Sequence, residues 1–294
     1  MKKTLSISQS DPIACLMPGI VYSQGTNYFG RVPRALEMHL MRPDAWSEGK
    51  NIWESGKKEK LPTVVWVIGG AWQQTAPLRF ASEFSFLAKA GYNVAMIDYR
   101  VTNEACYPIQ IQDVKTAIRF LRAHADQYGI EENRIAVMGD SSGGYLASMV
   151  GTTGGIEKYE GEEWAGYDSS VQAVIDEYGP VNLKEMHARW KNVFKTQMTP
   201  FIQFMGEEGI EDEKLLEEAN PINHIKETTP PFLILHGTKD ELVPAKESEA
   251  LYEALQKKQV PSDLYILEGA QHAGFEFWQP EIKEIILKFL NTYL

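Results

Sequence analysis

Cysteine is scarce in this chain of 294 residues, which contains only Cys15 and Cys106. Two cysteines cannot build a disulfide framework, and neither a C-x-x-C nor an H-E-x-x-H pattern supplies metal ligands. No run of about eighteen consecutive apolar residues occurs either, so the sequence contains no candidate transmembrane helix. These absences predict a reduced protein without a metal site, a cofactor or a membrane partner.

Basic residues are also outnumbered: the chain has 29 Lys and Arg residues and 40 Asp and Glu residues, which gives a formal net charge of −11. This balance disfavours nucleic acid and anionic membrane surfaces as partners. Acidic residues are concentrated in residues 157–163 and 207–218, which we interpret as solvated faces of inserted segments. The basic N-terminus is not followed by a continuous apolar run, which favours a cytoplasmic protein over an exported one.

Short apolar runs alternate with helix-like runs from residue 61 onward. Strands are predicted over residues 61–68, 93–97, 134–138, 171–177, 231–235 and 262–267, and helices over residues 77–90, 109–127 and 142–150. This alternation is typical of a doubly wound, mostly parallel α/β sheet. Residues 34–42 alternate in the manner of an early antiparallel strand. The length and the 44% hydrophobic content suit a single domain over residues 1–294.

The alternation breaks over residues 180–229, a passage with helical periodicity that carries Trp190, Phe194, Phe201 and Phe204. We predict that this segment is a helical cap, inserted after a strand and covering a crevice at the edge of the sheet. An aromatic stripe more often packs into a core than contacts a substrate, but a cap buries one face over the site beneath it. The aromatic residues therefore favour an aryl or sugar group in the substrate.

A G-x-S-x-G pentapeptide at residues 139–143 joins the apolar run 134–138 to a helix-forming run. Glycines on both sides of the serine permit a strained turn that exposes the hydroxyl group, and the N-terminal amides of the following helix face the same point. Register selects Ser141 as the candidate nucleophile, because Ser142 as the central residue would require glycine in place of Asp140.

A serine nucleophile needs a general base, and the base needs a carboxylate to orient it. Asp240 lies in the loop after the apolar run 231–235, and His272 lies in a glycine-flanked loop after the run 262–267. The order serine, acid, histidine is that of strand-turn-helix hydrolases, and loops at the carboxyl ends of parallel strands meet in one crevice. The sequence therefore predicts a triad of Ser141, His272 and Asp240.

Other residues compete for two of these roles. His236 is the rival base, although a histidine at the end of a strand is more often a half-buried packing residue. Glu241, next to Asp240, and Asp176, near the end of the predicted strand 171–177, are the rival acids.

A glycine-rich loop follows the predicted strand 61–68. We predict that the backbone N–H groups of Gly70, Ala71 and Ser142 stabilise a developing oxyanion, and that Gly69 and Trp72 contact the substrate. A glycine pair is also compatible with a phosphate-binding turn, but neither G-x-x-x-x-G-K-[ST] nor G-x-G-x-x-G is present.

Six ordered motifs, which together span roughly residues 60–290, resemble those of α/β-hydrolase esterases. They are Val-Val-Trp-Val-Ile-Gly-Gly-Ala-Trp at 64–72, Ile-Asp-Tyr-Arg at 97–100, Tyr107-Pro108 with Asp113, Gly-Asp-Ser-Ser-Gly-Gly at 139–144, Leu-His-Gly-Thr-Lys-Asp at 235–240 with Val243-Pro244, and Gly-Ala-Gln-His at 269–272. The resemblance is closest to bacterial feruloyl and acetyl-xylan esterases. Hormone-sensitive-lipase-type carboxylesterases and kynurenine formamidases are similar as well.

This resemblance implies the same triad and the same oxyanion-binding loop, with Asp98, Arg100 and Asp113 as scaffold residues and an ion pair between Arg100 and Asp113. Such esterases usually have a histidine before the glycine pair, which braces the loop. This chain has Ile68 at that position, so the loop lacks the bracing histidine and the oxyanion hole can differ in shape from that of these esterases.

The predicted activity is two-step hydrolysis of a small carboxylic ester through an acyl-enzyme, without a cofactor, on acetyl or feruloyl esters of carbohydrates or on small phenolic esters. A formamidase or amidase is one alternative, and a non-catalytic binding protein on the same fold is another. Dinucleotide binding by residues 137–144 is a more distant one. A homo-oligomer is compatible with the sequence.

Overall fold

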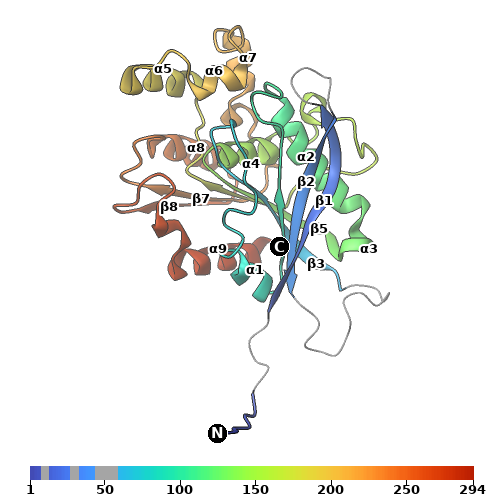
Figure 1. Ribbon diagram of the computed structural model, residues 1–294. Coiled ribbons are helices and arrows are strands. Elements are labelled where there is room, and N and C mark those ends of the chain that lie inside the picture. Colours follow the sequence, from blue (N-terminus) through green and yellow to red (C-terminus); the bar gives the residue numbers. More distant parts are fainter. Residues whose placement is uncertain (8–12, 27–32, 44–58) are drawn as a thin grey trace.

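A mixed β-sheet runs through the molecule (Figure 1). The computed structural model describes residues 1–7, 13–26, 33–43 and 59–294, and eight strands in these residues form one sheet in the order β1-β2-β4-β3-β5-β6-β7-β8. The strands are β1 (Ala14–Thr26), β2 (Pro33–Pro43), β3 (Leu61–Val67), β4 (Asn93–Ile97), β5 (Ile130–Asp140), β6 (Ala173–Glu177), β7 (Phe232–Gly237) and β8 (Ser262–Leu267). Only β1–β2 and β2–β4 pair antiparallel among these strands, so the predicted mostly parallel α/β sheet is confirmed.

Helices cover both faces of the sheet. They are α1 (Ser85–Lys89), α2 (Ile109–Ala123), α3 (Ala125–Tyr128), α4 (Ser142–Thr152), α8 (Lys246–Lys257) and α9 (Pro280–Tyr293). Alternate side chains of a strand point to opposite faces, and in β3 Val65 and Val67 pack into the core that includes α2, α4 and α8, while Val64 and Trp66 pack into the core that includes α1 and α9. Burial on both sides explains why β3 is almost wholly apolar.

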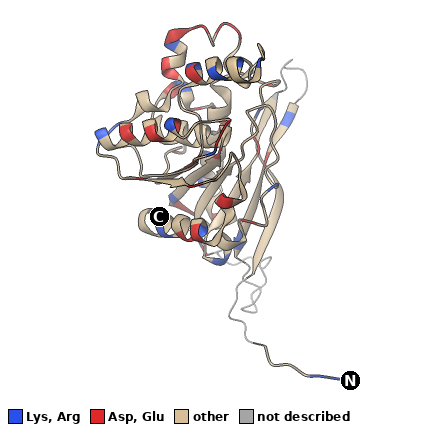
Figure 2. Cartoon of the chain, turned by 90° about the vertical axis from the view of Figure 1, so that its left-hand side faces the viewer, with Lys and Arg blue, Asp and Glu red and all other residues tan. Residues whose placement is uncertain are grey.

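The segment 180–229 leaves the sheet between β6 and β7. It contains α5 (Leu183–Phe194), α6 (Pro200–Met205) and α7 (Glu213–Glu218), which gather at one end of the molecule (Figure 1). Charged residues follow the outer surfaces of these helices, whereas the strands are largely uncharged (Figure 2). We call residues 180–229 the cap segment. None of the helices in the described part of the chain is long and apolar enough to cross a membrane.

The acidic stretches lie mostly at the surface, as predicted for solvated faces. Glu157, Glu162 and Glu163 are exposed, as are most acids of residues 207–218. Within residues 157–163 the exception is Glu160, whose carboxylate forms an ion pair of 2.7 Å with the fully buried Lys115. This acid therefore anchors its loop to α2 rather than facing solvent.

Two predicted helices are shorter in the structure. The helix expected over residues 77–90 is limited to α1, because residues 77–84 form successive turns in which Phe80 and Phe84 pack against Trp278, with ring centroids 4.7 and 5.5 Å away. The helix expected over residues 109–127 ends as α2 at Ala123, where His124 leaves helical geometry and stacks on Phe120 at 4.1 Å. Tertiary packing overrides helix propensity at both places.

The scaffold residues implied by the resemblance join the end of β4 to its neighbours: Asp98 and Arg100 follow β4, and Asp113 lies in α2. The side chain and N–H of Arg100 both bind Asp113, with Arg100 N 2.9 Å from Asp113 Oδ2, so the expected ion pair is present. The Asp98 carboxylate accepts hydrogen bonds from Arg34 and Thr75. These contacts tie β4 to β2 and to α2.

Candidate active site

Ser141 lies in a sharp turn between β5 and α4. Its backbone has φ 53° and ψ −121°, a conformation that costs about 1–3 kcal/mol in a non-glycine residue, and its N–H donates to Glu177 O at 2.8 Å. Glycine is required two residues later, since a Cβ atom on Gly143 would lie 1.9 Å from Val67 O. The close approach of α4 to β3 thus holds the Ser141 side chain at the carboxyl edge of the sheet.

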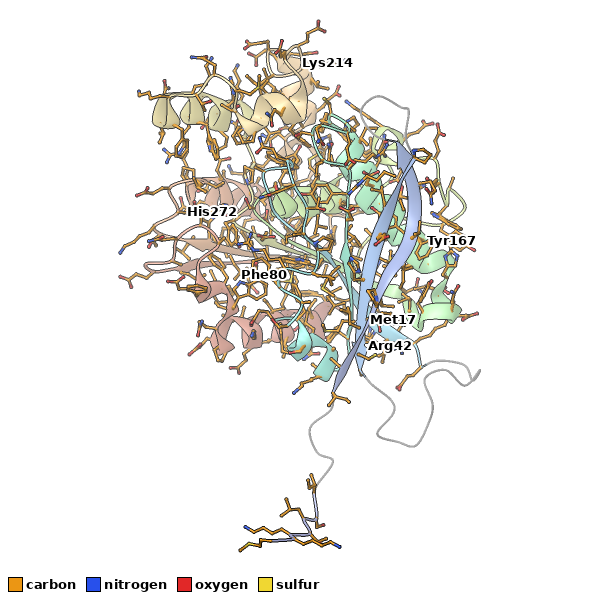
Figure 3. All side chains as sticks on the ribbon, viewed as in Figure 1. Met17, Arg42, Phe80, Tyr167, Lys214 and His272 are labelled. Carbon is orange, nitrogen blue, oxygen red and sulfur yellow. The ribbon has the colours of Figure 1, made fainter. Side chains whose placement is uncertain are left out.

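The three predicted triad residues meet at this edge. His272 Nε2 is 2.9 Å from Ser141 Oγ, and His272 Nδ1 is 2.6 Å from Asp240 Oδ2. Ser141 follows β5, Asp240 follows β7 and His272, which is labelled in Figure 3, follows β8. The structure therefore joins an acid, a base and a hydroxyl group in one hydrogen-bonded chain.

Asp240 is fixed by its surroundings. Its Oδ1 atom accepts hydrogen bonds from Leu242 N at 3.0 Å and Val243 N at 2.8 Å, and the side chain is 1% exposed. Burial acts to raise the pKa of Asp240, but hydrogen bonds with His236 and His272 outweigh it and lower the pKa to about 2. The carboxylate is therefore ionised at neutral pH, and it holds the proton of the imidazole on Nδ1.

The rival residues have other partners. Both ring nitrogens of the buried His236 are occupied, Nδ1 by Ser248 Oγ at 2.7 Å and Nε2 by Val243 O at 2.8 Å, with Asp240 Oδ2 3.4 Å from Nε2. His236 is thus a packing residue that also supports Asp240. Asp176 accepts hydrogen bonds from Ser148 and from Gly179 N, at 2.6 and 2.8 Å.

The Glu241 carboxylate has no hydrogen bond or ion pair within the described residues, and the side chain is exposed. Neither rival acid is therefore bonded to the imidazole of His272.

Residues 69–72, which we call the oxyanion loop, lie beside Ser141. Gly69 N donates to Asp140 Oδ1 at 2.6 Å, while Gly70 N and Trp72 N donate to Ser142 Oγ at 3.1 and 3.3 Å. No group in the described part of the chain accepts the N–H of Ala71 or the N–H of Ser142. Two of the three predicted donors are thus available, whereas the Gly70 N–H is directed to the hydroxyl group of Ser142.

The two predicted substrate contacts differ in accessibility. A Cβ atom on Gly69 would lie 3.0 Å from Ser141 Cβ, so Gly69 borders Ser141. The indole of Trp72 is 1% exposed and stacks on Phe204 at 4.4 Å, with Phe201 and Tyr145 at its edges. Trp72 therefore packs in the core in this structure and presents no open face to a substrate.

Sequence reasoning did not identify two residues that support the triad. The ring of Tyr178 packs edge-on against His272, with centroids 4.9 Å apart, and restricts the imidazole. Asp140 binds the oxyanion loop, and burial raises its pKa to about 6. Asp140 was visible as the variable residue of the pentapeptide, whereas no sequence signal distinguishes Tyr178.

A cavity of about 620 Å³ opens beside His272. Its lining is mostly polar and consists of Arg189, Thr238, Lys239, Asp240, Glu241, Leu242, Gln271 and His272. The cap segment contributes Arg189, whose Nη2 atom donates to Glu241 O at 2.7 Å, and the neighbouring Trp190 donates to Leu242 O at 3.2 Å. Helix α5 is thus attached to the loop that carries Asp240.

Metal ligands do not cluster in the described residues, where no group of three or more His, Cys, Asp and Glu side chains is arranged to hold an ion.

The buried carboxyl group of Glu177 has no hydrogen-bond partner among the described residues, and burial raises its pKa well above the usual value. Glu177 lies at the end of β6, and its backbone carbonyl accepts the N–H of Ser141.

Comparison with known proteins identifies several similar chains. A family model described as BD-FAE matches residues 52–255. Esterase LipC of Mycobacterium tuberculosis is 32% identical over 222 residues, which are 73% of this chain and 53% of LipC. The chain spans about half the length of the curated relatives it matches.

Two solved structures are similar over nearly the whole chain. A truncated carbohydrate esterase from gut microbiota superposes with a TM-score of 0.79 at 24% identity and covers 97% of this chain and 98% of its own. A bifunctional GH43-CE protein of Bacteroides eggerthii superposes with a TM-score of 0.77 at 26% identity and covers 95% of this chain and 38% of its own.

Proposed function

Because the chain belongs to the BD-FAE family and has the α/β-hydrolase fold predicted from its sequence, we propose that it is a serine carboxylesterase that acts through an acyl-enzyme on Ser141. The observation that carries this proposal is the hydrogen-bonded chain from Asp240 through His272 to Ser141, with distances of 2.6 and 2.9 Å. The name of LipC as an esterase supports the same chemistry.

The first half-reaction transfers the acyl group to the enzyme. His272 Nε2 accepts the Ser141 proton while Oγ attacks the ester carbonyl, and Asp240 stabilises the resulting imidazolium. The carbonyl oxygen becomes an oxyanion, for which the N–H groups of Ala71 and Ser142 are the available donors. The tetrahedral intermediate then collapses, and the alcohol leaves with the proton that His272 returns.

The second half-reaction releases the acid. A water molecule takes the place of the alcohol, gives a proton to His272 Nε2 and attacks the acyl carbonyl carbon. Collapse of the second tetrahedral intermediate returns that proton to Ser141 Oγ and frees the carboxylic acid. Asp240 remains ionised throughout, because its pKa is lowered to about 2.

We further propose that the leaving alcohol is polar, as in an acetyl ester of a carbohydrate. His272 protonates the leaving oxygen, and the cavity beside it has a polar lining that includes Arg189 and Gln271. Such groups suit hydroxyl-bearing ligands through directed hydrogen bonds. The burial of Trp72 removes one argument for an aryl acyl group, so acetyl esters are favoured over feruloyl esters.

The proposal predicts that Ser141→Ala abolishes hydrolysis of p-nitrophenyl acetate and labelling by a fluorophosphonate, while the circular dichroism spectrum is unchanged. Asp240→Asn should lower kcat by several orders of magnitude, because the imidazole loses the anion that fixes its tautomer. Asp176→Asn is the matched control and should retain most of the activity. Hydrolysis by Ser141→Ala at the unmutated rate would disprove the proposal.

A substrate panel tests the alcohol and the acyl group. Acetylated xylo-oligosaccharides, p-nitrophenyl butyrate, methyl ferulate and N-formylkynurenine separate carbohydrate, aliphatic, phenolic and formamide substrates. Arg189→Ala should raise KM for the acetylated oligosaccharide and leave KM for p-nitrophenyl acetate unchanged, since only the former has an alcohol large enough to fill the cavity. Equal effects on both esters would contradict the assignment of the cavity to the alcohol.

A further inference from the structure

The oxyanion loop has a backbone conformation that does not persist without support. Ala71 and Trp72 are consecutive non-glycine residues with positive φ values of 55° and 59°, and the turn they form is closed by a hydrogen bond of 3.0 Å from Gln73 N to Gly70 O. Each such residue costs about 1–2 kcal/mol relative to an ordinary conformation. Neighbouring groups must therefore hold the loop in place.

The side chain of Ser142 supplies that support. Its Oγ atom accepts the N–H groups of Gly70 and Trp72, which flank Ala71 on both sides. The residue is 2% exposed, so water does not compete for these bonds. Ser142 is also the first residue of α4 and follows the nucleophile directly, so its position is fixed relative to Ser141.

Tyr99 supports the chain just before the oxyanion loop. Its hydroxyl group donates to Ile68 O at 3.0 Å. Burial raises the pKa of Tyr99, so this hydroxyl group keeps its proton and remains a donor at neutral pH. The N–H groups of Gly70 and Trp72 meanwhile occupy both acceptor positions of the Ser142 hydroxyl group.

We propose that the Ser142 hydroxyl is the positioning group of the oxyanion loop: by binding Gly70 N–H and Trp72 N–H, it directs the Ala71 N–H between them toward the oxyanion. The side chain before the loop, Ile68, has no hydrogen-bonding atom and cannot do this. Ser142 thus has two separate roles, because its backbone N–H is a donor and its side chain orients the other donor. This inference rests on the proposed esterase function.

Ser142→Ala tests the inference, because it removes the hydroxyl group and keeps the backbone N–H. A small displacement of a catalytic group lowers the rate strongly, so kcat for p-nitrophenyl acetate should fall about 10- to 100-fold, with KM changed by less than about threefold. A trifluoromethyl ketone forms an oxyanion adduct with Ser141, and its affinity should fall by the same factor as kcat/KM. Tyr99→Phe should change both quantities in the same direction and by less.

Ser148→Ala is the matched control. Ser148 lies in the same helix, is fully buried and donates to Asp176 rather than to the oxyanion loop. It should retain kcat within about twofold of the unmutated value. A Ser142→Ala variant with unchanged kcat, or the same loss of kcat in both variants, would overturn the inference.

Amide hydrogen exchange gives a readout that does not depend on turnover. Peptides covering residues 66–76 should exchange faster in Ser142→Ala than in the unmutated protein, and at the unmutated rate in Ser148→Ala. Unchanged exchange in Ser142→Ala overturns the role of the hydroxyl group, whether or not the protein hydrolyses esters. If the unmutated protein does not hydrolyse esters but exchange changes as expected, the proposed function fails and the structural role of Ser142 is supported.

Discussion

Asp140 carries a buried carboxyl group directly beside Ser141, the proposed nucleophile. Its side chain accepts the Gly69 N–H, and burial raises its pKa from 3.8 to about 6. A raised pKa means that the folded protein binds the proton more tightly than the unfolded chain does. This group therefore stabilises the fold fully below pH 4, and its contribution is lost as the pH rises through 6.

Asp140→Asn should consequently become more favourable, relative to the unmutated protein, as the pH rises. The amide is neutral at every pH and still offers an oxygen to Gly69, whereas the unmutated protein must bury a charge above pH 6. A shift of about two pKa units corresponds to ~3 kcal/mol over the whole titration, and part of it is already lost at pH 4.5. The difference in the free energy of unfolding should therefore grow by ~2 kcal/mol between pH 4.5 and pH 8.

Urea unfolding of both proteins at several pH values measures this difference. Asp263→Asn is the matched control, because Asp263 lies on β8 with its side chain exposed to solvent. A difference between Asp140→Asn and the unmutated protein that stays constant, or shrinks, as the pH rises would refute the assignment of a buried charge to Asp140.

Some features of single residues could be predicted from the sequence, and others could not. Ser141, Asp240 and His272 could be predicted because each has a local signal, a strand end followed by turn-forming residues. The direction of the Gly70 N–H could not be predicted, because it depends on the Ser142 hydroxyl group, which is 72 positions away in the sequence. Trp72 was expected at the substrate, and its burial depends on the packing of α6, which its own surroundings in the sequence do not reveal.

At the scale of elements, α6 of the cap segment is packed against the oxyanion loop. The Phe204 ring lies parallel to the Trp72 indole at 4.4 Å, and the side chains of Gln73 and Gln203 are hydrogen-bonded. The cap segment therefore supports the loop through Trp72, and Phe204 also packs edge-on against Tyr145 of α4. Removing this contact should disturb the position of the oxyanion donors.

Phe204→Ala should lower both stability and kcat. Loss of a fully buried phenylalanine costs about 3–5 kcal/mol of unfolding free energy, and the Trp72 backbone would then shift. Phe289→Ala, in α9 and in the core on the opposite face of the sheet, is the matched control with a similar loss of stability. Thermal unfolding should show a similar loss of stability in both variants, whereas kcat should fall in Phe204→Ala alone. Equal kcat in both variants would refute the link between α6 and the site.

Element boundaries were less predictable than element types. The parallel strands have continuous apolar runs that fix their positions, and β4 and β8 begin and end at the predicted residues. The sequence does not predict strand β1, because its extended conformation is stabilised by antiparallel pairing with β2 rather than by a local pattern. The interruption at His124 arises from a side-chain contact with Phe120 that helix periodicity does not reveal.

At the scale of the whole molecule, the net charge of −11 creates a negative potential around the protein. Anionic esters should therefore approach more slowly than neutral ones at low ionic strength. We expect kcat/KM for 4-acetoxybenzoate to rise severalfold when NaCl increases from about 0.01 to 0.3 M, as the Debye length shortens from ~30 Å to below 10 Å.

Phenyl acetate, which has the same shape without the carboxylate, is the matched neutral substrate and should show little change with salt. A fall in kcat/KM for 4-acetoxybenzoate would contradict the expectation, and would mean that Arg189 and Lys239 at the cavity beside His272 outweigh the overall charge.

The general architecture was predictable because alternating strands and helices leave few topologies open. The order of the strands and the antiparallel pairing of β1 and β2 could not be predicted, since both depend on pairing between segments that are distant in the sequence.

The backbone of Gly143 packs directly on the carbonyl group of Val67, so α4 and the end of β3 touch without an intervening side chain. The nucleophile and the loop that follows β3 are thus parts of one rigid body, although some seventy residues separate them in the chain. Heating should not produce a folded but inactive form, and irreversible loss of turnover should begin at the temperature at which the sheet itself melts.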